Sequence, residues 1–164
     1  MMCLSKALTG GVIPMAITSF TQDIYDAFYD EEVNKALFHG HTFTANPVGC
    51  VAAITSLEIL NTSRMQENIS RINKHHLAFA EKLNQLEQVE NPRVLGVILA
   101  FEIKTESNKD YYGGFRQKLY DFFIENRVIL RPVGNTIYVL PPYIITDEQL
   151  ERVYDVLLLA TDLN

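Results

Sequence analysis

Apolar and polar positions along the chain are arranged in blocks, and their spacing predicts a mixture of strands and helices. Short apolar runs predict strands at residues 12–19, 94–103, 128–133 and 136–142. Apolar residues at three- and four-residue spacing predict helices at residues 21–31, 65–89 and 115–126, after Asn46 and after Thr146. Polar loops are expected around residues 38–47 and 104–114.

Two of these helices carry clear start signals. Asn46 precedes Pro47, and a capping side chain followed by proline at the first position is typical of a helix start. Thr146 and Gln149 have the spacing of a capping box, with acidic residues between them. The helix after Pro47 begins with several small residues, which suits close packing against another backbone.

The segment 65–89 shows the clearest apolar stripe, and Asn91-Pro92 is expected to end this helix. The stripe consists of Met65, Ile69, Ile72, His76, Phe79, Leu83 and Leu86. Two adjacent histidines, His75 and His76, lie in this helix, and only His76 falls on the stripe. We therefore interpret His76 as a core or interface histidine rather than as a ligand.

The order of the predicted elements indicates an α/β (α+β) fold. Residues 61–164 contain enough strands and helices to close as a small α/β domain. Residues 1–60 do not, because two strands with short helices need a larger sheet to join. We therefore expect residues 1–60 to be the terminal piece of a larger domain, and the chain to be the back portion of a longer protein.

Composition narrows the function classes. The chain has 164 residues, of which 48% are apolar, and a net charge of −6, which argues against a nucleic-acid surface. No apolar run is long enough to span a bilayer, and the first residues do not resemble a signal peptide. Cys3 and Cys50 lie far apart with no ligand spacing around them, which fits a reduced cytoplasmic protein better than a disulfide framework or a zinc site.

The first candidate for chemistry is Lys6, in the stretch CLSKALTGG. It follows a short apolar piece that resembles the end of a strand, where α/β folds display reactive groups. A lysine amine attacks carbonyls only when unprotonated, so a catalytic lysine needs a sheltered, apolar site. The alternative is an ordinary surface lysine beside a Gly-Gly turn, and the residues alone favour that alternative.

The second candidate is the stretch HGHTFTANP, before the helix that starts at Pro47. Hydroxyls such as those of Thr42 and Thr44, together with backbone N–H groups, could form an anion site. His39 and His41 alone do not make a metal site, because no further ligands lie nearby in the sequence. The alternative is a polar loop with no ligand.

The third candidate is the stretch LRPVGNTIYVLPPY. Arg131 lies within a predicted apolar strand, where an unpaired charge is costly, and Pro132 keeps it extended. Such a guanidinium suits a carboxylate of two oxygens, either on a substrate or on an internal Asp or Glu. Tyr138 could face the same space or belong to the core.

In this order, CLSKALTGG, FHGHTFTANPVGCVAA and RPVGNTIYVLPPYII resemble the C-terminal part of class III (fold-type I) pyridoxal-phosphate aminotransferases, over essentially all of the chain. The resemblance implies that Lys6 is the Schiff-base lysine. It also implies that Thr42 reaches across a homodimer interface to the cofactor phosphate of the other subunit. Gly40, Arg131 and Tyr138 are expected to contact the substrate, with Arg131 on its carboxylate.

The same resemblance implies pyridoxal phosphate as cofactor, small-molecule substrates, and no nucleic-acid or membrane partner. The pattern RPVG…IYVLPPY favours the branch of the class that acts in biotin biosynthesis over those acting on ornithine, 4-aminobutyrate or other ω-amino compounds. That branch passes an amino group from S-adenosylmethionine to 8-amino-7-oxononanoate. A second hypothesis is a C-terminal dimerisation module without catalysis of its own, since the isolated chain lacks much of the cofactor pocket of the class.

Two residues depart from the pattern of the class. Proline often stands where this chain has His41, and glycine often stands where it has Ala45. Both changes fall in the loop that is expected to meet the phosphate.

Overall fold

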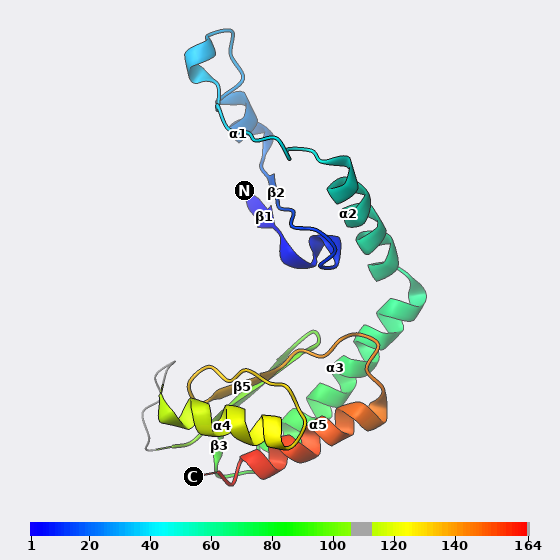
Figure 1. The fold of residues 1–164 in the computed structure, drawn as a ribbon, viewed down its shortest axis with the longest axis vertical. Helices are drawn as coiled ribbons and strands as arrows, with labels where there is room; N and C mark the ends of the chain where they lie inside the picture. The colour runs from blue at the N-terminus through cyan, green and yellow to red at the C-terminus, as the bar shows by residue number, and fades with distance from the viewer. Residues whose placement is uncertain (106–112, 164) are drawn as a thin grey trace. The chain divides into compact units, whose positions relative to one another are not determined.

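The structure, a computed structural model, describes residues 1–105 and 113–163. It divides into two compact units, Met1–Ser63 and Arg64–Asn164 (Figure 1). Most of the predicted loop at 104–114 lies outside the described residues. The mixed helix and sheet fold that the sequence predicts is confirmed, and each unit is considered by itself.

The first unit is built from short elements. Strands β1 (Met2–Leu4) and β2 (Ile17–Ser19) pair antiparallel, and the 3-10 helix η1 (Lys6–Thr9) follows β1. Next come α1 (Gln22–Asp26), the 3-10 helix η2 (Val33–Lys35) and α2 (Pro47–Leu60).

Two predictions for this unit are too long. The strand predicted at 12–19 covers only Ile17–Ser19, since Pro14 cannot donate to a ladder. The helix predicted at 21–31 stops at Asp26. Beyond it, the Asp30 carboxylate accepts the N–H of Glu32 at 2.9 Å and binds Lys35 Nζ at 2.6 Å, which stabilises a turn instead.

Helix α2 lies against the segment that follows β1. Its cap is as predicted, since the Asn46 side chain accepts the N–H groups of Val48 and Gly49 and Pro47 is the first helical residue. A side chain at Gly49 would stand 3.2 Å from Met15 Sδ, so the small residue there permits the close packing that the sequence predicts. Few other side chains of this unit are buried.

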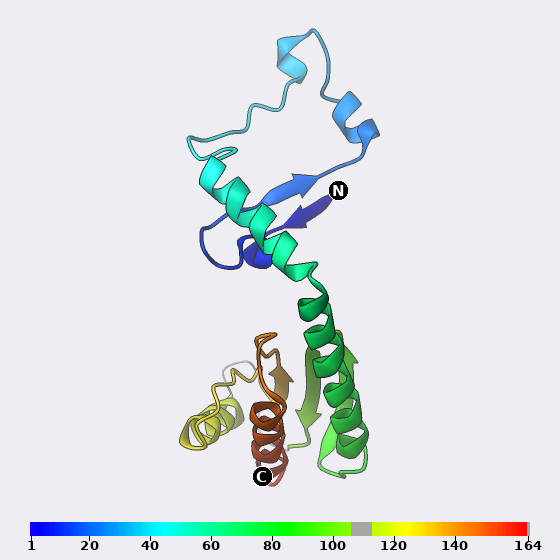
Figure 2. The ribbon, with the colours of Figure 1, turned by 90° about the vertical axis from the view of Figure 1, so that its right-hand side faces the viewer.

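The second unit is a three-stranded antiparallel sheet with three helices. Its elements are α3 (Ser63–Leu83), β3 (Val89–Leu95), β4 (Ile98–Ile103), α4 (Gly114–Glu125), β5 (Thr136–Val139) and α5 (Asp147–Ala160). The strand order is β3-β4-β5, and Figure 2 shows α3 and α5 running alongside the sheet. The capping box of α5 is present, with the Gln149 N–H bonded to the Thr146 hydroxyl and the reciprocal bond also formed.

Several predicted boundaries in this unit are wrong. The long helix ends at Leu83 rather than at residue 89, and Asn91-Pro92 lies inside β3, where the register shifts between Glu90 and Arg93. The strand predicted at 94–103 is the end of β3 and all of β4, joined through Gly96 at φ 57°. Residues 128–133 form no strand, and only a single bridge joins Val133 to Thr136.

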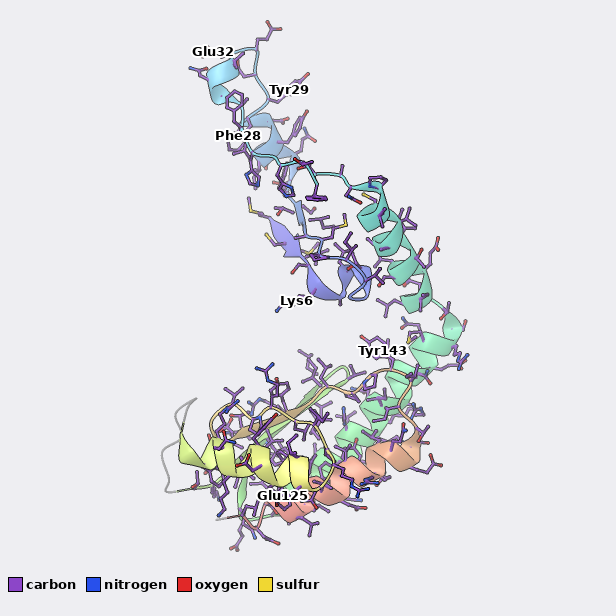
Figure 3. All side chains as sticks on the ribbon, viewed as in Figure 1. Lys6, Phe28, Tyr29, Glu32, Glu125 and Tyr143 are labelled. Carbon is purple, nitrogen blue, oxygen red and sulfur yellow. The ribbon has the colours of Figure 1, made fainter. Side chains whose placement is uncertain are left out.

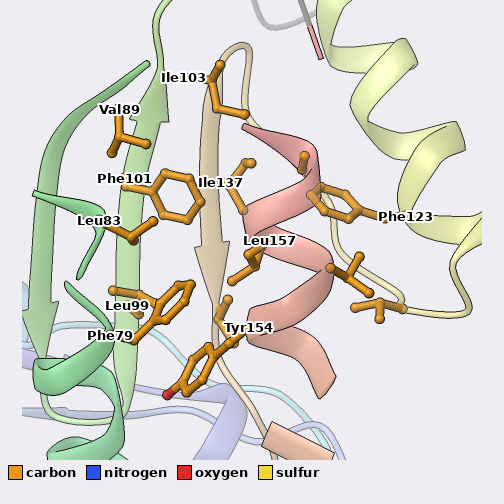
Figure 4. Close-up of a cluster of buried hydrophobic side chains, with 14 of the residues drawn as sticks. Phe79, Leu83, Val89, Leu99, Phe101, Ile103, Phe123, Ile137, Tyr154 and Leu157 are labelled. Carbon is orange, nitrogen blue, oxygen red and sulfur yellow. The ribbon is translucent and has the colours of Figure 1, made fainter. Parts of the chain in front are cut away.

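The core of the second unit lies on one face of its sheet (Figure 4). Alternate residues of β4 and β5 point into it, with Phe101 opposite Ile137 and Leu99 opposite Val139. The three helices add apolar side chains to the same cluster: Phe79, Leu83, Phe115, Leu119, Phe123, Leu150, Tyr154 and Leu157. The opposite face, which carries Ala100, Glu102 and Tyr138, remains partly exposed.

Candidate functional site

Lys6 stands at the end of β1, which is the position that the sequence predicts. Ser5 precedes it in an extended conformation, and Lys6 opens η1 with a φ of 56°. This is the left-handed region, which residues with a side chain rarely adopt. A backbone in that region costs about 1–3 kcal/mol and persists only where surrounding contacts impose it.

Contacts on both sides of η1 impose this backbone. The buried Thr9 hydroxyl donates to the carbonyl of Ile13 at 2.6 Å and closes the turn that contains Gly10 and Gly11. The Ser56 hydroxyl of α2 donates to the carbonyl of Ala7 at 3.3 Å. The lysine-bearing segment is therefore attached both to the chain that follows it and to α2.

The side chain of Lys6 is exposed and extends away from the ribbon of its unit (Figure 3). Within residues 1–105 and 113–163, its amine forms no hydrogen bond or ion pair. The first unit by itself therefore does not supply the sheltered, apolar surroundings that a neutral lysine amine requires.

Thr42 lies in a turn at residues 42–45 that leads into the cap of α2. The Thr44 hydroxyl is engaged by this turn, because it accepts the backbone N–H of His41 at 3.0 Å. In the part of the chain that the structure describes, the hydroxyl and N–H of Thr42 have no such partner. Of the two threonines considered from the sequence, Thr42 is thus the one whose polar groups the turn leaves available.

Two neighbours of Thr42 have different backbone requirements. Ala45 has a φ of 56°, in the region that favours glycine, which agrees with the glycine often found there in the class. A side chain at Gly40 would meet Thr44 Oγ1 at 3.9 Å, an ordinary contact. The described residues therefore do not themselves require glycine at position 40, and its role beside the substrate stays a prediction.

Arg131 and Tyr138 belong to the second unit, on either side of a tight turn. A single antiparallel bridge, between Val133 and Thr136, closes this turn. Tyr138 is paired with Ala100 on the partly exposed face of the sheet and is 37% exposed. Arg131 is exposed and lies outside any strand, so the prediction of a strand around it is wrong.

Within residues 1–105 and 113–163, no carboxylate pairs with Arg131. The five predicted site residues are divided between the units: Lys6, Gly40 and Thr42 on the first, Arg131 and Tyr138 on the second. Within the second unit, the bridge between Val133 and Thr136 joins the segments that carry Arg131 and Tyr138.

Sequence reasoning missed a polar cluster that joins α3 to the start of α5. Arg71 binds the carboxylate of Asp147. His75 lies between two acids, with Nε2 at 3.2 Å from Asp147 and Nδ1 at 3.3 Å from Glu151. The sequence signal was present, since Arg71 and His75 are spaced to share one face of the helix, but their partners lie more than seventy residues away.

Within residues 1–105 and 113–163, no group of three or more His, Cys, Asp or Glu side chains is placed to hold a metal ion. None of the described helices combines the length and the apolar character needed to cross a membrane.

Comparison with known proteins identifies the class. The family model for class III aminotransferases matches residues 1–160, so the chain belongs to the class III aminotransferase family. Among its relatives is the adenosylmethionine-8-amino-7-oxononanoate aminotransferase of Synechococcus elongatus, which is 38% identical over 154 residues. That alignment covers 94% of this chain and 36% of the relative.

Solved structures of aminotransferases also match this chain. The crystal structure of adenosylmethionine-8-amino-7-oxononanoate aminotransferase from Methanocaldococcus jannaschii matches with a TM-score of 0.84 at 33% identity, over 98% of this chain and 38% of that one. An amine transaminase from an uncultivated Pseudomonas species, in its PLP-bound form, matches with a TM-score of 0.82 at 26% identity, over 97% and 37%. This chain thus spans little more than a third of the length of these relatives.

Proposed function

We propose that this chain carries the cofactor lysine and the C-terminal domain of a pyridoxal-phosphate aminotransferase of biotin biosynthesis. The reaction would transfer an amino group from S-adenosylmethionine to 8-amino-7-oxononanoate and give 7,8-diaminononanoate. The observation that carries this proposal is the 38% identity, over 94% of this chain, to a relative named for that activity. The fold alone does not choose among substrates, because the amine transaminase matches almost equally well.

The residues present fit the chemistry of this cofactor. Lys6 offers an amine, Thr42 a hydroxyl and N–H, and Arg131 a guanidinium, and none of the three is engaged with another described residue. An amine suits an aldehyde, a hydroxyl with an N–H suits a phosphate, and a guanidinium suits a carboxylate. When bound, the cofactor supplies an electron sink that stabilises negative charge on the substrate carbon.

Each residue then has a defined task. Lys6 would hold the cofactor and later, as a free amine, move a proton to and from the substrate carbon. Thr42 would bind the phosphate of the partner subunit's cofactor in a homodimer. Arg131 would orient the oxo-acid by its carboxylate, beside Gly40 and Tyr138.

The exposure of Lys6 limits what the isolated chain does. The unit that carries Lys6 provides no apolar wall for its amine, and the relatives contain about twice as much additional chain as is matched. We propose that those other parts of the family fold supply the shelter. With pyridoxal phosphate, the purified 164-residue chain should accordingly gain little lysine-dependent visible absorbance. A strong band that is lost in Lys6→Ala would contradict this.

The cytoplasm is the proposed site of this activity. Cys3 and Cys50 are both free, as is usual in a reducing compartment.

A direct assay tests the substrate assignment. The protein isolated from the cells that make it is incubated with S-adenosylmethionine and 8-amino-7-oxononanoate, and 7,8-diaminononanoate is measured by mass spectrometry. Formation of this product, with far slower turnover of ornithine and 4-aminobutyrate, is expected. Preference for the ω-amino compounds would instead assign another class III activity. Loss of Arg131 as Arg131→Ala should raise the KM for the oxo-acid, and an unchanged KM would remove its carboxylate role.

A non-catalytic module is the second candidate function, and the exposed Lys6 amine is the observation that favours it. In that case the same protein would form no product with any of these substrates. It would also retain no pyridoxal phosphate after dialysis.

A further inference from the structure

The turn that carries Thr42 is built around one residue, His41, through both its side chain and its backbone. The imidazole Nδ1 of His41 accepts the backbone N–H of Phe43 at 3.1 Å. The backbone of His41 takes part as well, because its N–H donates to Thr44 Oγ1 at 3.0 Å and its carbonyl accepts the N–H of Thr44 at 2.9 Å. His41 therefore forms three hydrogen bonds with the two residues that follow Thr42, and none of these bonds uses a polar group of Thr42.

The bond from Phe43 to the ring defines the chemistry of the imidazole. A ring nitrogen that accepts a hydrogen bond carries no proton, so the proton of the neutral ring lies on Nε2. The geometry is that of an Asx turn, in which a side-chain acceptor binds the N–H two residues further along. Histidine thus does here what asparagine or aspartate does in most such turns.

The arrangement has a consequence for Thr42. With the Phe43 and Thr44 N–H groups satisfied inside the turn, the N–H and hydroxyl of Thr42 are among the polar groups that remain for a ligand. The turn continues into the cap of α2, where Asn46 accepts the N–H groups of Val48 and Gly49. The turn is therefore connected to a helix of 14 residues.

We propose that His41 is a positioning residue, whose ring nitrogen holds the turn in the form that presents Thr42 to the phosphate of the cofactor. This inference rests on the proposed function, since it takes pyridoxal phosphate as the ligand of Thr42. It adds a residue that acts through the backbone of the turn and does not itself touch the cofactor.

Two substitutions distinguish the role of His41 as a hydrogen-bond acceptor from the role of its aromatic ring in packing. His41→Phe keeps an aromatic ring near Phe43, whose centroid lies 6.4 Å from that of His41, but removes the acceptor. His41→Asn removes the ring and restores an acceptor at the position that an Asx turn uses. A role in packing predicts that Phe replaces His41 well, whereas a role as acceptor predicts that Asn does.

NMR of the ¹⁵N-labelled 164-residue chain tests, without any ligand, whether the His41 ring holds the turn. The wild type should show the His41 proton on Nε2, and a Phe43 amide that exchanges slowly for a turn. In His41→Phe the exchange of this amide should be about fivefold faster, as expected for one lost hydrogen bond. In His41→Asn it should return toward the wild-type rate. Equal exchange in all three proteins would overturn the proposal.

Titration with pyridoxamine phosphate tests whether Thr42 binds the phosphate, because this probe carries the phosphate but no aldehyde to condense with lysines. The titration uses the protein isolated from the cells that make it, freed of its cofactor, since the proposed function places the partner subunit's phosphate at Thr42. Calorimetry should give the same Kd for the wild type and His41→Asn, and a Kd about fivefold higher for His41→Phe. Thr42→Val should also raise the Kd, whereas pyridoxamine, which lacks the phosphate, should not distinguish these proteins.

The possible results separate this inference from the proposed function. A Kd that Thr42→Val raises and His41→Phe leaves unchanged would overturn the role of His41 while the phosphate role of Thr42 stands. A Kd that Thr42→Val leaves unchanged, with slow exchange of the Phe43 amide intact, would contradict the phosphate role and the proposal with it.

Discussion

The imidazole Nδ1 of His76 lies 2.7 Å from the phenol oxygen of Tyr154, and both side chains are buried between α3 and α5. The other ring nitrogen, Nε2, lies 3.1 Å from the carbonyl of Val97 and donates to it. Nδ1 is therefore the acceptor of the Tyr154 hydroxyl proton, and the ring is neutral. The Tyr154 ring also stacks on Phe79 at a centroid distance of 4.1 Å.

Removal of the Tyr154 hydroxyl should destabilise the protein. In Tyr154→Phe the aromatic packing is kept, but Nδ1 of the buried His76 loses its partner, and the free energy of unfolding should fall by about 1–3 kcal/mol. Urea denaturation followed by circular dichroism measures this. Tyr143→Phe is the control, since Tyr143 is only partly buried, and should change stability by less than about 0.5 kcal/mol. Equal effects of the two substitutions would contradict the account.

The same pair predicts a pH dependence. Burial lowers the pKa of His76 below its ordinary value of 6.5, against a smaller opposing effect of the hydrogen bond to Val97. The unfolded chain thus binds a proton at this residue more readily than the folded chain. The contribution of His76 to stability is therefore complete above the ordinary value of 6.5 and is lost as the pH falls below it. Urea midpoints measured on both sides of this value should show the decrease.

His76→Gln provides the control for this pH effect. Its midpoint should change less with pH than that of the wild type. An identical pH dependence in the two proteins would exclude His76 as the source.

Thr9 should be important for the backbone that presents Lys6. Its hydroxyl is buried and donates to Ile13 at 2.6 Å. Thr9→Val keeps the shape and removes this donor, so local stability should fall by about 1–2 kcal/mol, whereas Thr9→Ser should retain most of it. The amide of Val12, which donates to the Thr9 carbonyl at 3.2 Å, should exchange faster in the valine variant. Equal exchange in both variants would show that the hydroxyl is dispensable.

Helix α2 should make the isolated chain self-associate. Apolar residues lie all around this helix, and Val51 and Ile54 are 62% and 57% exposed. A helix that is apolar on every side is usually buried. Sedimentation velocity should therefore show oligomers that grow with concentration, and the double variant Val51→Glu, Ile54→Lys should reduce them. A strict monomer at high concentration would contradict this.

The helices were predictable where a cap or a clear period was present. Asn46-Pro47 and the Thr146 capping box fixed two starts, and the stripe around His76 fixed the buried face of α3. The strands were harder. Asn91-Pro92 resembles a helix end, but proline is tolerated in β3 because this strand lies at the edge of the described sheet and has an irregular register there.

Strand boundaries inside apolar runs depend on distant partners. The apolar run at 94–103 contains a turn at Gly96, and the apolar run at 128–133 pairs with another segment only at the bridge of Val133. The site was predictable only as three stretches. That the His41 ring accepts the N–H of Phe43, or that Thr44 is engaged and Thr42 is not, depends on backbone geometry that residue types do not specify.

The central claim concerns the amine of Lys6, and covalent mapping tests it most directly. The protein isolated from the cells that make it is treated with borohydride, which fixes pyridoxal phosphate to the nitrogen that holds it, and is then digested for mass spectrometry. We predict a phosphopyridoxyl group on Lys6, in the peptide that contains SKALTGG. A cofactor fixed to another lysine, or to none, would contradict the account.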